Sequence, residues 1–192
     1  MSIDEPAVAE TERLVVRQWR LDDEVDRYLD IYSRDEVVRW LGGPPVHDRG
    51  RAIELIERNA ARLAIDPRFG WWAVVPRATG VPAGSVLLKP LPNGEGEIEI
   101  GWHLHPDSWG IGLASEAASA VLARAFAEIG LEEVWAVTHL DNDRSARVCE
   151  RIGMRLLGVT NRWYPEPSLM FWVGAGPDRE PSLRPDAPAT RA

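Results

Sequence analysis

Lysine and cysteine are almost absent from this sequence of 192 residues. Its 22 basic residues include a single lysine, Lys89, and the rest are arginine. The single cysteine, Cys149, excludes a disulfide within the chain. Because 30 residues are acidic, the formal net charge is −8, and a chain of this charge repels phosphate. We therefore expect no nucleic-acid partner, and a G+C-rich codon bias explains the excess of arginine as well as any function does.

Long apolar runs are also missing. No segment approaches the roughly 20 apolar residues that a membrane-spanning helix needs. The acidic start, Met1–Glu12, lacks the basic and apolar regions of a signal peptide. We therefore expect a cytoplasmic protein without a membrane partner. Hydrophobic residues make up 45% and charged residues 27% of the chain, which is ordinary for a globular protein.

Composition divides the chain into three parts. Residues 1–11 are predicted to be a flexible leader and residues 12–173 a single domain. Residues 174–192 contain four prolines and only one large aliphatic residue, Leu183. Such a segment buries too little apolar surface to offset its ordering entropy. We therefore expect it to be a disordered, proline-rich tail.

Periodicity predicts an α+β fold with a mixed sheet in the order βααβββαβαββ. Asp22 and Asp23 are candidate caps for the first helix, and Asn142 for the last. Strands are expected at 14–19, 71–75, 85–88, 97–104, 134–138, 156–160 and 169–173, and helices after residue 23 and at 48–64, 113–129 and 143–152.

The strand at 97–104 alternates strictly. Ile98, Ile100, Trp102 and Leu104 fall on one face, whereas Glu97, Glu99, Gly101 and His103 fall on the other. Four of the nine tryptophans are read as core residues: Trp19, Trp40, Trp102 and Trp135.

The segment His105–Glu116 joins this strand to a helix and carries the clearest chemical signal. Gly110 and Gly112 allow a tight turn and a close approach to a ligand, and the first helical turn offers unpaired N–H groups. That combination suits phosphate. A Walker loop is excluded because its lysine is missing, and Ser115 stands at the third glycine position of a dinucleotide fingerprint. A coenzyme A pyrophosphate loop and a connector that binds nothing remain.

Residues 109–114, Trp-Gly-Ile-Gly-Leu-Ala, resemble the acyl-CoA loop of the GNAT acyltransferase superfamily, Q/R-x-x-G-x-G/A. Gly112 and Ala114 match its small residues. Trp109 departs from its Gln or Arg, and this Trp is typical of the RimJ/RimL-type branch, which acetylates the N-termini of ribosomal proteins. Three further segments are similar to that branch: 11–14, 97–102 and 142–154.

The resemblance implies a GNAT-like, mostly antiparallel sheet flanked by helices. It also implies that acetyl-CoA is the cosubstrate, without a metal, and that its acetyl group moves to a primary amine by direct attack on the thioester. The residues expected to bind acetyl-CoA are Leu104, Trp109, Gly110, Ile111, Gly112, Leu113, Ala114, Ser115 and Asn142.

Two residues are expected to take part in the chemistry. By resemblance, Glu99 is the general base that acts through a water, with Glu97 and His103 as alternatives. Many superfamily members have a tyrosine on the helix after the Asn, but residues 143–153 contain none. By resemblance, Ser145 stands at the N-x-x-S position of the branch and is the candidate to hydrogen-bond the departing thiolate.

Three readings of the function stay open at this point. The acceptor is a peptide or protein N-terminus or another small amine, and an acidic surface favours a cationic one. A small-molecule detoxifying acetyltransferase, acting on an antibiotic or a polyamine, is the second reading. The third is a CoA-binding sensor without catalysis. The sequence is compatible with a monomer or a homodimer. A metal site at His103, His105 and Asp107 lacks a fourth ligand.

Overall fold

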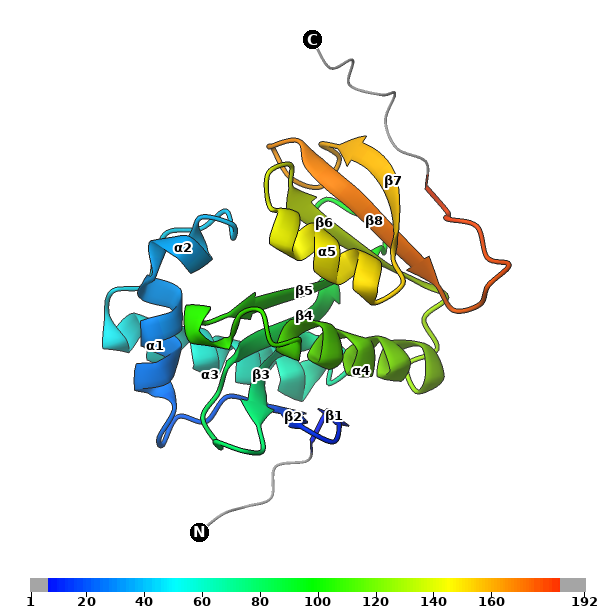
Figure 1. Cartoon of the computed structure of the whole chain (residues 1–192). Helices are drawn as coiled ribbons and strands as arrows, with labels where there is room; N and C mark the ends of the chain where they lie inside the picture. Colours follow the sequence, from blue (N-terminus) through cyan, green and yellow to red (C-terminus); the bar gives the residue numbers. More distant parts are fainter. Residues whose placement is uncertain (1–6, 184–192) are drawn as a thin grey trace.

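The computed structural model describes residues 7–183. An eight-stranded sheet forms its centre, with the strand order β1-β2-β3-β4-β5-β6-β8-β7 (Figure 1). A short 3-10 helix, Pro106–Ser108, follows β5. The remaining elements are β1 (Ala9–Glu10), β2 (Leu14–Arg17), α1 (Val25–Ser33), α2 (Asp35–Val38), α3 (Arg49–Ile65), β3 (Gly70–Pro76), β4 (Gly84–Pro90), β5 (Ile98–Leu104), α4 (Leu113–Ala127), β6 (Glu133–His139), α5 (Asp143–Arg151), β7 (Arg155–Thr160) and β8 (Ser168–Gly174).

The sheet is antiparallel except between β5 and β6. These two strands are parallel and are joined at a single residue pair, Glu99 with Trp135. Beyond that pair β5 continues to Leu104 and β6 to His139 without pairing to each other. The strands therefore part towards their carboxyl ends. The predicted α+β class and the mostly antiparallel sheet are confirmed.

Each face of the sheet is packed by its own helices. Helices α4 and α5 lie in front of the sheet in Figure 1, and α3 lies behind it. The front core is built from β2–β6, β8, α4 and α5, with Trp72, Ile100 and Phe171 fully buried. The rear core joins α1 and α3 to β3 through apolar residues such as Ile31 and Ala73. The alternation of β5 thus separates two differently packed surfaces.

The structure confirms the predicted cap of α5, and α3 has a cap that was not predicted. The Asp48 carboxylate accepts a hydrogen bond from the Arg51 N–H and begins α3. The Asn142 side chain likewise accepts one from the Ser145 N–H and begins α5. The expected Asp caps of α1 are wrong, because both aspartates are exposed and α1 begins after the buried Glu24.

The Glu24 carboxylate makes no cap bond and instead pairs with Arg17, whose Nη1 lies 3.0 Å from Oε2. A buried carboxylate needs such a cation, which explains why a glutamate occupies this position.

Both ends of the predicted domain differ from expectation. Within the predicted leader, Ala9–Glu10 forms β1 and pairs with β2. Within the predicted tail, Gly174 belongs to β8, and the Ala175 N–H donates to the Glu132 carbonyl at 2.9 Å. Leu183 packs against a third cluster that includes Trp135. Residues 175–183 therefore lie against the sheet, and the rest of the predicted tail, 184–192, is outside the described residues.

Candidate functional site

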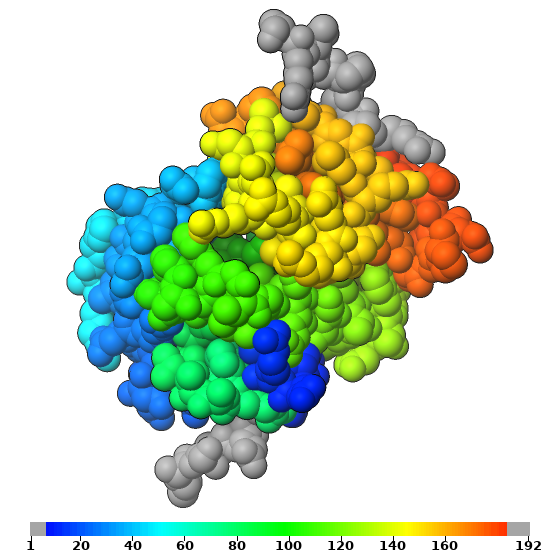
Figure 2. All heavy atoms as spheres, in the orientation of Figure 1, coloured from blue at the N-terminus to red at the C-terminus, as the bar shows by residue number. Residues whose placement is uncertain are grey.

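A cleft of about 880 Å³ opens where β5 and β6 part. Trp102 and Leu104 line it from the face that α4 covers. His103 lines it from the opposite face, where it contacts rings of the rear core. The cleft therefore passes through the sheet. Figure 2 shows the hollow between the blue N-terminal helices, the green loop after β5 and the yellow helix α5.

The cleft has two sides, which differ in composition. The α4 side consists of Trp109, Gly110, Gly112, Leu113, Ala114, Ser115, Asn142, Asp143, Arg144, Ser145, Arg147, Val148 and Arg151. The α2 side consists of Glu36, Val37, Arg39, Trp40 and Leu41. Trp19 and Trp135 are buried as predicted, and Trp102 is half-buried and packs against the front core. Trp40 is half-buried and belongs to no core cluster of the described residues, so its assignment to the core is wrong.

On the α4 side, two glycines shape the turn into α4. Gly110 has a φ of 79° and Gly112 a φ of 86°, a conformation that side chains disfavour. Gly112 is the N-cap of α4, and the first intrahelical bond runs from the Glu116 N–H to its carbonyl. Within residues 7–183 no protein group accepts a bond from the N–H groups of residues 113–115. These N–H groups, at the positive end of a helix dipole, face the cleft as a ready anion site.

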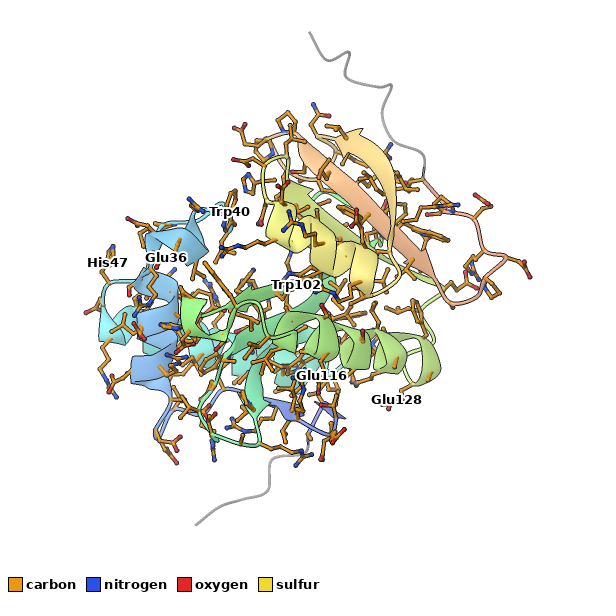
Figure 3. The ribbon with its side chains drawn as sticks, viewed as in Figure 1. Glu36, Trp40, His47, Trp102, Glu116 and Glu128 are labelled. Atoms are coloured by element: carbon orange, nitrogen blue, oxygen red, sulfur yellow. The ribbon has the colours of Figure 1, made fainter. Side chains whose placement is uncertain are left out.

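The segment before β2 fixes this turn. Arg13 donates from Nε to Glu116 at 2.7 Å and from Nη1 to the Ile111 carbonyl at 3.3 Å. Burial by itself raises the pKa of Glu116, but hydrogen bonds from Thr11 and Arg13 outweigh it and lower that pKa. Glu116, labelled in Figure 3, is thus an ion-paired anchor rather than a free charge that would repel an anion.

Three arginines of α5 also face the cleft, and the sequence analysis missed them. Arg144, Arg147 and Arg151 are spaced i, i+3 and i+7, which places them on one helical face. Arg151 donates to the Ser115 hydroxyl at 3.1 Å and so links α5 to the first turn of α4. The i, i+3, i+7 spacing could have indicated a basic helical face from the sequence, but codon bias explains the arginines of the chain equally well as a class.

Trp109 occupies the position where the acyl-CoA loop usually has Gln or Arg. Its indole Nε1 donates to the Leu104 carbonyl at 2.8 Å, so it joins the end of β5 to the loop. The Arg144 guanidinium lies 4.6 Å from the centre of its ring. The Trp therefore braces the loop and holds one arginine of α5 in place.

The structure brings together all but two of the residues predicted to form the site. Leu104 and the predicted residues of the α4 side line the cleft, including Ser145, whose hydroxyl bonds to no other described residue. Ile111 does not line it, because its side chain is 58% exposed and only its carbonyl is engaged. Glu99 is the second exception.

Cys149 is buried, and burial raises the pKa of its thiol to about 12, so it is not a nucleophile.

Glu99 lies at the point where β5 and β6 part, but its carboxylate is engaged elsewhere. It pairs with Lys89 at 2.6 Å and accepts a hydrogen bond from the Tyr164 hydroxyl at 2.8 Å, both through Oε2. Towards the cleft, a side-chain atom of Leu87 lies 3.3 Å from where a Cβ on Gly101 would stand. Leu87 therefore fills the space between Glu99 and His103.

The histidines after Gly101 have different surroundings. His105 is buried between Asp30 and Asp107, at 3.1 Å and 2.9 Å. Burial by itself raises the pKa of Asp107, but hydrogen bonds from Ser108, His105 and Arg27 outweigh it and lower that pKa to about 2. Among the described residues no cluster of three or more His, Cys, Asp or Glu could hold a metal ion. His105 thus ties α1 to the loop after β5.

Residues 13–155 match the family model for the acetyltransferase (GNAT) domain. The chain belongs to the GNAT family. A curated relative, the uncharacterized N-acetyltransferase YoaA of Bacillus subtilis, is 31% identical over 156 residues, which are 81% of this chain and 87% of YoaA. This GNAT chain is therefore an acyl-CoA-dependent N-acetyltransferase.

Solved structures share the fold. A GNAT acetyltransferase from Bacillus anthracis has a TM-score of 0.75 and 24% identity, covering 87% of this chain and 98% of that one. RimL, a ribosomal alpha-N-protein acetyltransferase, in complex with coenzyme A, has a TM-score of 0.73 and 16% identity, covering 88% and 98%. GNAT acetyltransferases use acetyl-CoA, and the free N–H groups and arginines of the α4 side fit its phosphates. In residues 7–183 no helix has the length and apolarity that crossing a bilayer requires.

Proposed function

We propose that this enzyme binds acetyl-CoA on the α4 side of the cleft and transfers the acetyl group to a primary amine that enters from the α2 side. The observation that carries this proposal is the cleft itself, which passes through the sheet between β5 and β6. The N–H groups of residues 113–115 would hold the pyrophosphate, and Arg144, Arg147 and Arg151 would balance its charge. The thioester can then meet the amine inside the sheet.

The acceptor is proposed to be the amine of a peptide or protein N-terminus or of a small molecule. Trp40, labelled in Figure 3, lies on the segment after α2. Its ring is 5.6 Å from that of His139 at the end of β6. This contact covers the α2 side and favours an extended chain over a bulky ring system. Glu36 and Asp141 also line the cleft, and their carboxylates favour a cationic acceptor such as a polyamine. The small-molecule alternative rests on these two carboxylates.

Two residues are proposed for the chemistry. Glu99 is the proposed general base, and the arrangement supports it through one feature: its Oε1 atom has no partner among the described residues. Because Leu87 lies between it and the cleft, a proton would reach Glu99 only through water or after Leu87 moves. Ser145, which lines the cleft, is proposed to donate a hydrogen bond to the departing sulfur.

A direct assay tests the proposal. Purified protein is incubated with acetyl-CoA and a panel of amines that contains N-terminal peptides, polyamines and aminoglycosides, and free thiol is followed with time. Thiol release that depends on one amine class, with a matching product mass, supports the proposal and names the acceptor. Acetyl-CoA binding without release for any amine would contradict it and favour a CoA-binding sensor.

A further inference from the structure

His103 is the polar residue on the rear face of β5 that lines the cleft. Glu99 shares that face but does not line the cleft. The His103 side chain packs against aromatic rings, with ring centres 5.0 Å from Trp71 and 6.0 Å from Tyr32. The proposed function gives this histidine no step. The inference below rests on the proposed function, because it concerns how the acceptor amine is held.

A chain of hydrogen bonds lies behind His103. The indole of Trp19 donates to the Ser85 hydroxyl at 3.0 Å, and the Tyr32 hydroxyl donates to the same oxygen at 2.8 Å. His103 Nδ1 lies 3.5 Å from the Tyr32 hydroxyl. Burial raises the pKa of Tyr32 well above its ordinary value, so this hydroxyl keeps its proton.

An accepting Nε2 requires one tautomer of His103. A neutral imidazole has one N–H, which must then be on Nδ1 and point at the Tyr32 oxygen, while the Tyr32 hydrogen points at Ser85. Nε2 bonds to no described residue and is not fully buried, and His103 is one of the residues that line the cleft.

The ring is also held in its neutral form. Burial among these aromatic rings, with a smaller contribution from the nearby Lys89 ammonium, lowers the pKa of His103 to about 3. At neutral pH the imidazole can accept a hydrogen bond, but it is too weak a base to keep a proton. Docking an amine requires only a lone pair on the ring, whereas a general base must also hold the proton, so the two roles can be distinguished.

We propose that His103 is the residue that docks the acceptor amine, with Nε2 accepting one N–H of the neutral amine inside the cleft. The single lone pair of the amine nitrogen then points at the thioester carbon. The nitrogen forms a bond to that carbon, the carbon–sulfur bond breaks, and its electron pair leaves with the sulfur. The proton that the nitrogen sheds passes to water or to Glu99 and finally gives the free thiol. His103 holds no proton at any stage.

Nitrogen NMR of the free enzyme tests the tautomer without any assay of activity. The chain has four histidines, and their ¹⁵N signals can be assigned with single variants. We expect His103 with a protonated Nδ1 and a bare Nε2, unchanged between pH 5 and pH 8. Tyr32→Phe removes the oxygen that orients the ring and should give a mixture of tautomers. A protonated Nε2, or titration near pH 6.5, would overturn the proposal.

Three variants then measure the docking role. His103→Leu removes the lone pair and should lower kcat/KM for the acceptor about 3- to 10-fold, the usual value of one neutral hydrogen bond. His103→Gln places a carbonyl oxygen near the Nε2 position and should keep most of the activity. His103→Asn reaches only the Nδ1 position and should resemble the Leu variant. A loss beyond about 100-fold would instead identify a general base and overturn docking.

Calorimetry with acetyl-CoA separates the two proposals. Each His103 variant should bind acetyl-CoA as the wild type does, because the α4 side is unchanged, and circular dichroism should confirm folding. If the wild type acetylates an amine while His103→Leu keeps full kcat/KM, the docking role alone fails. If the wild type binds acetyl-CoA but acetylates no amine, the proposed function fails and the NMR result still decides the tautomer.

Discussion

The two sides of the cleft are built on different principles. The α4 side is formed by two segments that are each continuous in the sequence. One is the glycine turn at the N-terminus of α4, and the other is one face of α5. The α2 side comes from segments far apart in the sequence, with Trp40 reaching His139 and with Tyr32, Trp71 and Ser85 surrounding His103. A backbone-built anion site can therefore be kept while the acceptor region changes, which suits one donor and many acceptors.

The largest expected effect lies on the α4 side. Gly112→Asp places a carboxylate where the phosphates are proposed to lie, and like charges at roughly 4 Å near a protein surface repel by about 4 kcal/mol. Calorimetry should show acetyl-CoA affinity lowered more than about 100-fold, while circular dichroism stays native.

Gly112→Ala is the matched control for backbone strain. It adds only the cost of a positive φ, about 1–2 kcal/mol, and its Cβ would stand 3.6 Å from Arg13 without a clash. If the Asp variant bound acetyl-CoA no more weakly than the Ala variant, the phosphates would lie elsewhere.

The second effect tests Glu99. If Glu99 is the base, Glu99→Gln should lower kcat/KM by about 10²–10⁴ at neutral pH, and less at high pH, where more of the amine is already neutral. Glu97→Gln is the control, since this carboxylate accepts a bond from the Glu95 N–H in the preceding loop.

The ion pair between Glu99 and Lys89 gives Glu99→Gln a second expected effect, on stability. Removing the carboxylate leaves the ammonium without its partner, which lowers thermal stability whatever the chemistry. A lower Tm with an unchanged pH–rate profile would show that Glu99 only joins β4, β5 and Tyr164.

A smaller effect is expected from the arginine face of α5. Arg151→Gln removes a charge near the phosphates and the bond to Ser115, and should weaken acetyl-CoA binding about 10-fold at low salt. The difference from wild type should shrink as salt rises. Arg155→Gln is the control, because Arg155 pairs with Glu180 outside the cleft. Equal losses in both variants would point to a general charge effect.

The last expected effect, small per pH unit, concerns stability and pH. The pKa of His103 is about 3 in the folded chain, against 6.5 as its ordinary value, so between these two values the unfolded chain binds more protons. Stability should therefore fall as pH drops below 6.5, by at most about 1.4 kcal/mol per pH unit from this residue. Urea unfolding at several pH values should show a shallower decline for His103→Gln. An identical decline would mean that His103 is protonated in the folded chain.

Local features of the fold could be predicted because they depend on few neighbours. Asn142 caps α5, as predicted, through a bond to the N–H group three residues away. The α2 helix and β1 were missed because two to four residues carry no periodicity. The described part of the tail was misjudged because its contacts are made with Glu132, Glu133 and the Trp135 cluster, which sequence distance conceals.

By itself, the sequence determined the glycine turn on the α4 side of the cleft, but not which arginines of α5 join it. Positive φ values at Gly110 and Gly112 and free N–H groups at a helix start are properties of a short backbone segment. Only the tertiary structure decided which polar residue of β5 reaches the cleft. Strand alternation puts Glu99 and His103 on the same face of β5. The pairing of β4 with β5 places Lys89 beside Glu99, where the two form an ion pair, and places Leu87 over Gly101. The parting of β5 from β6 leaves His103 at the opening, because a strand's exposure depends on its partners and not on its own residues.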